Sequence, residues 1–340
     1  MDRRRLAALT LGLLMLGSGP AAAIEVCDAP PRYGLGQAAI NIVRAACEEH
    51  RLWGRPFFDP QGHVASLGVT EAEREDLTDH GVIAWQRVAR YWRESGTLAQ
   101  IGGEPGAASC WATPGNRATD SDCRAFVVDT PWSAAFVSWI MTRAGIANFF
   151  RSPRHIDYIR AAWRDTAGSG PYRYADPVTE KPAPGDLLCF IRGRDQPLGY
   201  AGLTAALAGP GPVPSESHCE IVVAANLGGD RTLHLIGGNV LNTVMMRALP
   251  LDRSGHVILP APLTPIPDSG GALPPDRQCL PSQPDQCDFN RQDWAVLLQL
   301  RPQEVPVAQA PPSPEIPTAP AGGEPTPAAP VTPAETVTPP

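Results

Sequence analysis

Ser133, His218 and Asn239 are residues whose types and order along the chain could support acyl transfer. A serine hydroxyl becomes a nucleophile when an imidazole accepts its proton, and a polar third residue can hold that imidazole in place. We therefore predict Ser133 as the nucleophile, His218 as the base and Asn239 as the orienting residue. Glu220 is the rival orienting residue, because side chains alternate along a strand and it shares a face with His218. The same order of residue types occurs in many chains, so it has little specificity alone.

A single helix with clear ends is predicted around Ser133. Asp129 or Thr130 can cap its start, and Pro131 suits the first helical position because its missing N–H would be unpaired there anyway. Gly145 suits the left-handed position after the last turn. Ser133 would begin the core-facing stripe, beside first-turn N–H groups that can stabilise an oxyanion. The simpler interpretation, which the pattern alone favours, is a small polar residue that fills the first turn.

Hydrophobic periodicity predicts further helices beside this one, and strands follow them in the second half of the chain. The helices cover residues 37–50, residues 70–95, where Thr70 opens a capping box and Gly81 could break the helix, and a short stretch from Ser152. The turn at residues 227–230 predicts an antiparallel hairpin between two of the strands. The runs that predict strands are residues 187–191, 217–224, 231–236, 243–248 and 295–300.

Three further side chains are candidates to bind substrate. His155 and Tyr158 lie three residues apart on one flank of the short helix and could border a groove, or form a plain helix-surface pair. Trp132 is expected in the core, with a place on the groove wall as the second interpretation. Two segments rich in Gly and Pro accompany these elements. Residues 102–130 predict an ordered loop, and residues 195–216 a long insertion of the kind that forms lids or binding loops.

The two ends of the chain differ in composition from the middle. A positive start, an apolar run and the small residues 21–23 predict an export signal over residues 1–23, so we expect a periplasmic or extracellular protein. The next segment, residues 24–69, is interpreted as an N-terminal helical extension, followed by a hydrolase-type domain at residues 70–301. The Pro/Ala-rich tail, residues 302–340, cannot bury a core and should be disordered. A tether or wall-spanning spacer is its alternative role.

Charge and composition exclude several classes of partner. The net charge of -7 is spread along the chain, and no basic cluster indicates binding to nucleic acid or to an anionic membrane surface. We expect no membrane anchor, because the apolar run of the signal is too short to span a bilayer and the residues before Cys27 do not fit a lipid anchor. No C-x-x-C pair is present, so we expect no structural zinc site and no cofactor. The sequence leaves the oligomeric state open.

The eight cysteines are an even number in a chain expected to be exported, which favours disulfides. Cys189 is interpreted as a core thiol or as one joined to a partner across the sheet. Cys219 is expected to point to the opposite face from His218 and to be structural too. The pairs favoured by short spacing are Cys279–Cys287, Cys110–Cys123 and, third, Cys27–Cys47.

Four segments together resemble the family catalogued as domain of unknown function 2272. They are PWSAAFVSW (131–139), PGDLLCF (184–190), HCEIVV (218–223) and IGGN (236–239), and the resemblance covers roughly residues 70–300. That family looks like a distant branch of the papain-like cysteine peptidase clan, near the CHAP and NlpC-type enzymes that cut bacterial cell-wall peptides. The resemblance implies a papain-like α+β fold, with N-terminal helices packed on an antiparallel sheet. The pair of His155 and Tyr158 is similar to a His-x-x-Tyr pair of the same family.

The resemblance also implies roles for individual residues. In CHAP and NlpC-type enzymes a cysteine nucleophile opens the helix and a strand histidine is the base. Ser133 stands at the position of that cysteine, His218 matches the histidine and Asn239 matches the polar third residue. Gly237 stands where CHAP members often place an acidic residue.

Serine in place of cysteine leaves the chemistry open. A thiol ionises at modest cost, whereas a serine hydroxyl needs a strong base and a firm oxyanion hole. Ser133 is compatible with a serine hydrolase, with a groove that has lost its chemistry, or with chemistry moved to another residue. The first function we consider is an exported hydrolase of amide bonds in a peptide-containing substrate such as peptidoglycan. The alternative is a catalytically silent module that binds cell-wall peptide or glycan on the same scaffold.

Overall fold

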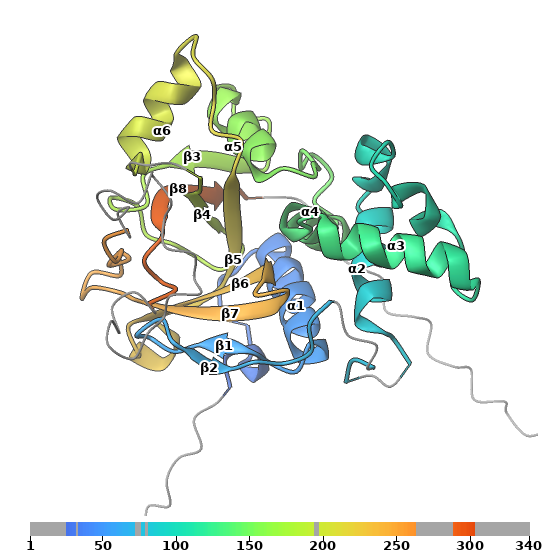
Figure 1. The fold of residues 1–340 in the computed structure, drawn as a ribbon. Coiled ribbons are helices and arrows are strands. Elements are labelled where there is room, and N and C mark those ends of the chain that lie inside the picture. The colour runs from blue at the N-terminus through green and yellow to red at the C-terminus, as the bar shows by residue number, and fades with distance from the viewer. Residues whose placement is uncertain are drawn as a thin grey trace, which may run out of the picture. The chain divides into compact units, whose positions relative to one another are not determined.

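Within the residues that the structure describes, eight strands form one mixed sheet that organises the fold (Figure 1). The computed structural model describes residues 25–31, 33–71, 76–78, 81–193, 197–262 and 288–302. The strands lie in the order β2-β1-β7-β6-β5-β4-β8-β3, and neighbouring pairs are antiparallel except β1 with β7, which is parallel. Their bounds are β1 (Phe57–Phe58), β2 (Val64–Ser66), β3 (Tyr172–Ala175), β4 (Leu187–Ile191), β5 (Ser217–Ala225), β6 (Thr232–Val240), β7 (Thr243–Pro250) and β8 (Asp293–Leu300).

Six α-helices accompany the sheet in the described part of the chain, so the fold is of the predicted α+β class. Helix α4 lies between the sheet and the pair α2 and α3, while α5 and α6 lie near the end of the sheet that carries β3 (Figure 1). None of these helices has the length and apolar character needed to cross a bilayer. Their bounds are α1 (Gln37–Leu52), α2 (Ala84–Glu94), α3 (Arg117–Asp129), α4 (Ser133–Arg143), α5 (His155–Arg164) and α6 (Gly199–Ala208).

The five predicted strands are confirmed as β4 to β8, and β5 and β6 form the expected hairpin. Alternate residues of β4 belong to two different hydrophobic clusters. Cys189 is in the cluster that includes the helices, whereas Leu188 and Phe190 are in the cluster on the other face. Both faces of β4 are therefore buried, which explains why its sequence is apolar throughout rather than alternating. Strands β1, β2 and β3 were not predicted, and they are short.

Helix α4 begins at Ser133 and not at Pro131 as predicted. Thr130 has an extended backbone, with φ -113° and ψ 117°, because the ring of a following proline disfavours the helical conformation. Asp129 and Thr130 therefore end α3, a helix within the segment predicted as an ordered loop, and they do not cap α4. The N-cap residue of α4 is Trp132, whose side chain makes no capping hydrogen bond.

The other end of α4 has the predicted glycine termination. Gly145 has φ +77°, and its N–H donates to the Thr142 carbonyl at 3.1 Å. The Ile146 N–H donates to the Met141 carbonyl at 2.9 Å. These two bonds satisfy carbonyls of the last turn and require the left-handed backbone that glycine adopts without strain. Every residue from 133 to 141 is buried, so α4 is enclosed on all sides and does not present a single apolar stripe.

The N-terminal segment shares a core with the rest of the described chain. Helix α1 confirms the helix predicted at residues 37–50 and packs in the same hydrophobic cluster as α4, while β1 pairs with β7. The helix predicted from Thr70 is wrong in its start, because α2 begins only at Ala84. The backbone of Gly81, with φ +138°, interrupts the chain just before it. Helix α6 lies within the segment predicted as a long insertion.

Three disulfides join cysteines of the described residues. The bonds Cys27–Cys47 and Cys110–Cys123 confirm two predicted pairs. The third, Cys189–Cys219, joins directly paired positions of β4 and β5 and so settles the structural role expected of both residues. The predicted pair Cys279–Cys287, the export signal and the Pro/Ala-rich tail lie outside the described residues.

Candidate active site

Ser133 and His155 are the first residues of α4 and α5, and their side chains meet in the interior. Ser133 Oγ lies 2.7 Å from His155 Nε2, a hydrogen bond in which the imidazole tautomer decides which atom donates. The first-turn N–H groups of α4 have no partner within the helix and carry the positive end of its dipole. The hydroxyl therefore has both a potential proton acceptor and potential oxyanion donors beside it.

Tyr158 contacts the other nitrogen of the same ring, because its hydroxyl forms a hydrogen bond with His155 Nδ1. Two proton arrangements satisfy this chain of groups. In the first, Nδ1–H donates to Tyr158 Oη, and Nε2 accepts the proton of Ser133. In the second, Tyr158 donates to Nδ1, and Nε2–H donates to Ser133 Oγ. Only the first arrangement makes His155 a base for the serine.

His218 packs against His155, and the described residues show no hydrogen bond between His218 and Ser133. The two imidazole rings pack with centroids 5.0 Å apart, and Phe190 packs on His218 with centroids 5.1 Å apart. Both ring nitrogens of His218 are buried with no hydrogen-bond partner in the described part of the chain. The sequence predicts His218 against Ser133, whereas the structure puts the imidazole of His155 there.

Glu220 shares a face of β5 with His218, as the alternation of side chains predicts. Its Oε1 lies 3.6 Å from His218 Nε2. The same carboxylate accepts three hydrogen bonds from Arg247 on β7, at 2.9 to 3.2 Å. Arg247 in turn donates to the carbonyl of Phe289 and to Asn290 Oδ1. Sequence reasoning missed Arg247, although a charged residue inside an otherwise apolar strand could have indicated it.

Of the two predicted orienting residues, Glu220 contacts His218 and Asn239 does not hydrogen-bond to it. Asn239 is half-buried at a left-handed position of the backbone, with φ +56°. Gly237 lies on β6, two residues before Asn239. A Cβ at this position would lie 3.0 Å from His218 Nε2 and 2.8 Å from Glu220 Cγ. The backbone of β6 therefore approaches the histidine directly, and an acidic side chain at position 237 would displace it.

Burial determines the charge of this cluster. It lowers the pKa of His155 and of His218 well below the ordinary value, and the positive charge of Arg192 acts in the same direction on both. Burial also raises the pKa of Tyr158 well above its ordinary value. Both imidazoles and the phenol are therefore uncharged at neutral pH. A neutral imidazole is the form that can accept a proton from a hydroxyl.

The cluster is enclosed by its neighbours. Ser133 is 9% exposed, His155 3% and His218 0%. Among cavities lined by described residues, one of about 50 Å³ reaches Tyr158 and is also lined by Phe149. Neighbouring side chains therefore cover most of Ser133.

Trp132, predicted in the core or on a groove wall, lies in the core. It is fully buried, and its ring stacks on Trp53 with centroids 5.6 Å apart. It also packs on Tyr91, with centroids 5.7 Å apart. This packing fixes the residue that precedes Ser133 and so the start of α4.

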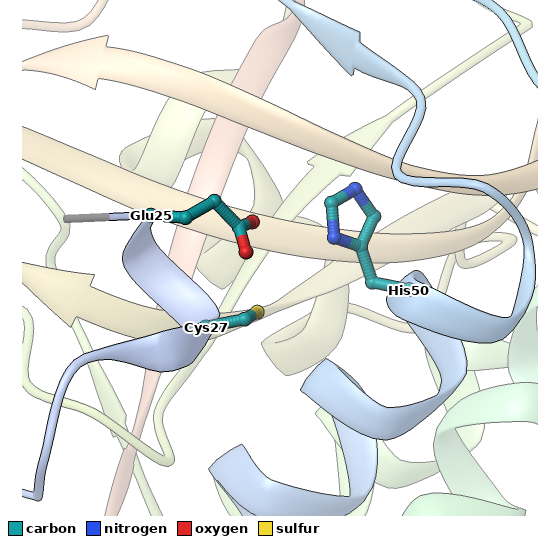
Figure 2. Close-up of side chains that lie close together, drawn as sticks. All are labelled: Glu25, Cys27 and His50. Carbon is teal, nitrogen blue, oxygen red and sulfur yellow. The ribbon is translucent and has the colours of Figure 1, made fainter. Parts of the chain in front are cut away.

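Three residues of metal-binding types, one of them a disulfide-bonded cysteine, come together elsewhere in the described part of the chain. Ligand atoms of Glu25, Cys27 and His50 all lie within 4.8 Å of one another (Figure 2). The cluster around Ser133 instead joins a hydroxyl, an imidazole and a phenol through hydrogen bonds. These are groups suited to proton transfer and nucleophilic chemistry.

Comparison with known proteins gave a family but no individual relative. No curated protein and no solved structure matches the chain. The family model described as "uncharacterized protein conserved in bacteria (DUF2272)" matches residues 79–300, which is more than half of the 340 residues. The matched range includes Ser133, His155 and His218. The chain therefore belongs to the DUF2272 family, as the four sequence segments predicted.

Proposed function

We propose that this protein is an exported hydrolase that cleaves amide bonds in a peptide-containing substrate such as peptidoglycan, by acyl transfer through Ser133. The observation that carries the proposal is the 2.7 Å hydrogen bond between Ser133 Oγ and His155 Nε2 at the N-terminus of α4. A helix-borne hydroxyl beside an antiparallel sheet is also the arrangement expected for a papain-like scaffold. The substrate class rests on the resemblance to CHAP and NlpC-type enzymes, and the disulfides are compatible with export.

The reaction follows from the positions of the side chains. Ser133 Oγ attacks the amide carbonyl while His155 Nε2 takes its proton, and N–H groups of the first turn of α4 hold the oxyanion. His155 then gives the proton to the leaving amine, which leaves an acyl group on Ser133. Water, deprotonated by the same imidazole, hydrolyses that ester and restores the hydroxyl.

Within this proposal His218 is a positioning residue, which differs from the role expected from the sequence. Its ring packs on His155, and the carboxylate of Glu220 lies behind it. An imidazolium forms on His155 during the reaction. The negative charge of Glu220 would stabilise it through the intervening ring of His218, without direct contact. Arg247 offsets much of the charge, so the effect is smaller than that of a carboxylate in direct contact.

The first experiment asks whether Ser133 is the nucleophile. The mature chain is incubated with peptidoglycan fragments and, separately, with a fluorophosphonate probe that labels activated serines. We expect turnover and labelling by the wild type, and a loss of about 10³-fold or more for Ser133→Ala. Ser121→Ala, at an exposed position on α3, is the control and should behave as wild type. Unchanged turnover by Ser133→Ala would remove Ser133 from the mechanism.

A pair of matched variants distinguishes which of the two histidines is the base. If His155 is the base, His155→Gln loses as much activity as Ser133→Ala, while His218→Gln loses only about 10-fold. If His218 takes the proton, the two losses are reversed. His63→Gln, at an exposed position, controls for a general effect of replacing histidine.

The variant Tyr158→Phe distinguishes the two proton arrangements of Tyr158, His155 and Ser133. When Tyr158 accepts from Nδ1–H, removing its oxygen leaves that donor unpaired and lowers kcat by about 10- to 100-fold. When Tyr158 donates to Nδ1, its removal frees the imidazole to change tautomer, and kcat does not fall. A variant at least as active as wild type would contradict the base-competent arrangement.

A second candidate function is a silent module that binds cell-wall peptide or glycan, and the burial of the cluster favours it. With Ser133 at 9% exposure and His218 at 0%, the hydroxyl has little direct access to a substrate. This function predicts co-sedimentation with purified cell walls and no turnover over long incubation. Turnover that disappears in Ser133→Ala would exclude it.

A further inference from the structure

The structure points to a second site at the start of the chain, remote in sequence from Ser133. It is built from the short helix η1 (Val26–Asp28), the residue before it and the last turns of α1. Figure 2 shows the carboxylate of Glu25, the sulfur of Cys27 and a ring nitrogen of His50 turned toward one another. Their ligand atoms all lie within 4.8 Å of one another. Cys47, on α1, is the disulfide partner of Cys27, so a second sulfur is bonded to one of these three ligand atoms, although it is not itself within 4.8 Å of all of them.

We propose that reduction of the Cys27–Cys47 disulfide converts this cluster into a binding site for a divalent metal ion of the Zn²⁺ class, with Glu25, Cys27, Cys47 and His50 as ligands. In the disulfide form the sulfurs are bonded to each other and are poor ligands. Once reduced, they complete a set of two thiolates, one imidazole and one carboxylate. Zinc binds such sets of sulfur, nitrogen and oxygen ligands in tetrahedral geometry.

His50 is the residue that distinguishes this cluster from an ordinary disulfide. Its side chain is almost fully buried, with 2% of the residue exposed. Its Nε2–H donates to the Pro56 carbonyl at 2.9 Å, which leaves the lone pair on Nδ1. Nδ1 has no hydrogen-bond partner among the described residues. A carbonyl that holds one ring nitrogen of a histidine while the other is free is the usual support of a metal ligand.

The charges around the cluster also suit a metal ion with these ligands. Two thiolates and a carboxylate around a divalent ion leave one net negative charge. Arg55 lies 2.7 Å from Glu25 Oε2 and can compensate it. Ligands at zinc are about 3.3–3.8 Å apart in a tetrahedron. The ligand atoms of Glu25, Cys27 and His50, now within 4.8 Å of one another, would approach by up to about 1 Å, and the two bonded sulfurs would move apart after reduction.

Cys27 and Cys47 are 9% and 3% exposed, which gives a reductant limited access to their disulfide. Cys27 and Cys47 line a cavity of about 250 Å³ between η1 and α1. Cys189 and Cys219, by contrast, are 0% exposed within the sheet. Reduction by a dithiol transfers two electrons and two protons to Cys27–Cys47 and oxidises the dithiol to its own disulfide. The metal ion then displaces the two thiol protons.

The experiment uses the full mature chain. It is reduced with a water-soluble phosphine under anaerobic conditions, and the phosphine is then removed. Co²⁺ replaces Zn²⁺ as the probe, because thiolate-to-cobalt charge transfer and tetrahedral d–d bands report the ligands directly. We expect one equivalent of Co²⁺ with both signatures in the reduced protein, none in the oxidised protein, and displacement by Zn²⁺. Circular dichroism of the reduced protein checks that it is folded.

Variants assign the ligands. Cys27→Ser/Cys47→Ser should abolish the charge-transfer band, while Cys110→Ser/Cys123→Ser, which removes a different disulfide, should keep it. Glu25→Gln and His50→Gln should each weaken binding by about 10-fold or more. Glutamine at position 50 can still donate an N–H to the Pro56 carbonyl, so it removes the ligand atom and keeps a donor for the supporting bond.

A second measurement does not depend on spectra. Zn²⁺ should slow alkylation of Cys27 and Cys47 in the reduced protein by more than 10-fold, and His50→Gln should need about 10-fold or more Zn²⁺ for the same protection. The proposal is overturned if the reduced chain unfolds, if it binds no stoichiometric Co²⁺, or if binding is indifferent to residues 25, 27, 47 and 50. The last result would mean an adventitious ion only.

Discussion

His155 and His218 illustrate how burial sets the chemistry available to a residue. Water is excluded from both rings, so the charged form of each is disfavoured and their pKa values lie well below the ordinary value. The sequence marks both as candidates but cannot show which one meets Ser133. That choice depends on how α5 packs beside α4, and no local pattern encodes it. Alternation along β5 was enough to place Glu220 on the face of His218.

Glu71 gives a prediction for the dependence of stability on pH. Its side chain is 1% exposed, and burial raises its pKa from 4.5 to about 7. Because the folded pKa is above the unfolded one, the fold favours the protonated carboxyl, and the free energy of unfolding falls as pH rises from about 5 to about 8. We expect Glu71→Gln to stabilise the protein by about 1–2 kcal/mol more at pH 8 than at pH 5. Urea denaturation at the two pH values measures the difference.

The control for this prediction is Glu48→Gln, at an exposed position of α1. It should change stability equally at both pH values. A Glu71→Gln variant with the same stability difference from wild type at pH 5 and pH 8 would show that Glu71 has an ordinary pKa in the fold.

Gly237 is predicted to tolerate no side chain. A methyl group there would lie within 3.0 Å of atoms of His218 and Glu220. We expect Gly237→Ala to lower the free energy of unfolding by about 1–3 kcal/mol, because both side chains are buried and would have to shift. Thermal denaturation measures it, with Gly211→Ala, which has nothing within 4 Å of its new Cβ, as the control. Equal stability of the two variants would contradict the close approach of β6.

At the level of elements, the ease of prediction follows length and periodicity. Strands β4 to β8 are long enough for an apolar run to identify them, whereas β1 has only two residues, Phe57 and Phe58, and depends on pairing with β7. Helix α3 is not predicted from the sequence, because its segment is rich in Gly, Pro, Ser and Asp, which is the composition of a loop. The break at Pro131 is the local signal that separates α3 from α4.

Asn116 is the residue that starts α3. Its Oδ1 accepts hydrogen bonds from the N–H groups of Ala118 at 3.0 Å and Thr119 at 3.4 Å. We expect Asn116→Ala to lower the free energy of unfolding by about 1 kcal/mol, and Asn116→Asp, which keeps the acceptor, to change it by only a few tenths. Chemical denaturation of both variants tests this. Equal losses for alanine and aspartate would show that the cap does not stabilise α3.

At the level of the whole molecule, residues 25–69 are joined to the sheet rather than appended to it. Strand β1 pairs with β7, and α1 buries Ile42 and Ala46 completely. We expect a chain that begins at Thr70 to lose cooperative thermal unfolding, because one face of the core would be exposed. A chain that ends at Pro302 is the comparison and should keep its melting temperature within about 2 °C. Cooperative unfolding of the first chain would show that the N-terminal segment is dispensable.

The position of β8 constrains when this protein can assemble. Because β8 (Asp293–Leu300) lies between β4 and β3, the strand at Tyr172–Ala175 has no neighbour on either side until the chain has been made as far as residue 300. A ribosome delivers residues in order from the N-terminus, so β3 stays unpaired in the interval before β8 is made. Holding chaperones would find their substrate in that interval.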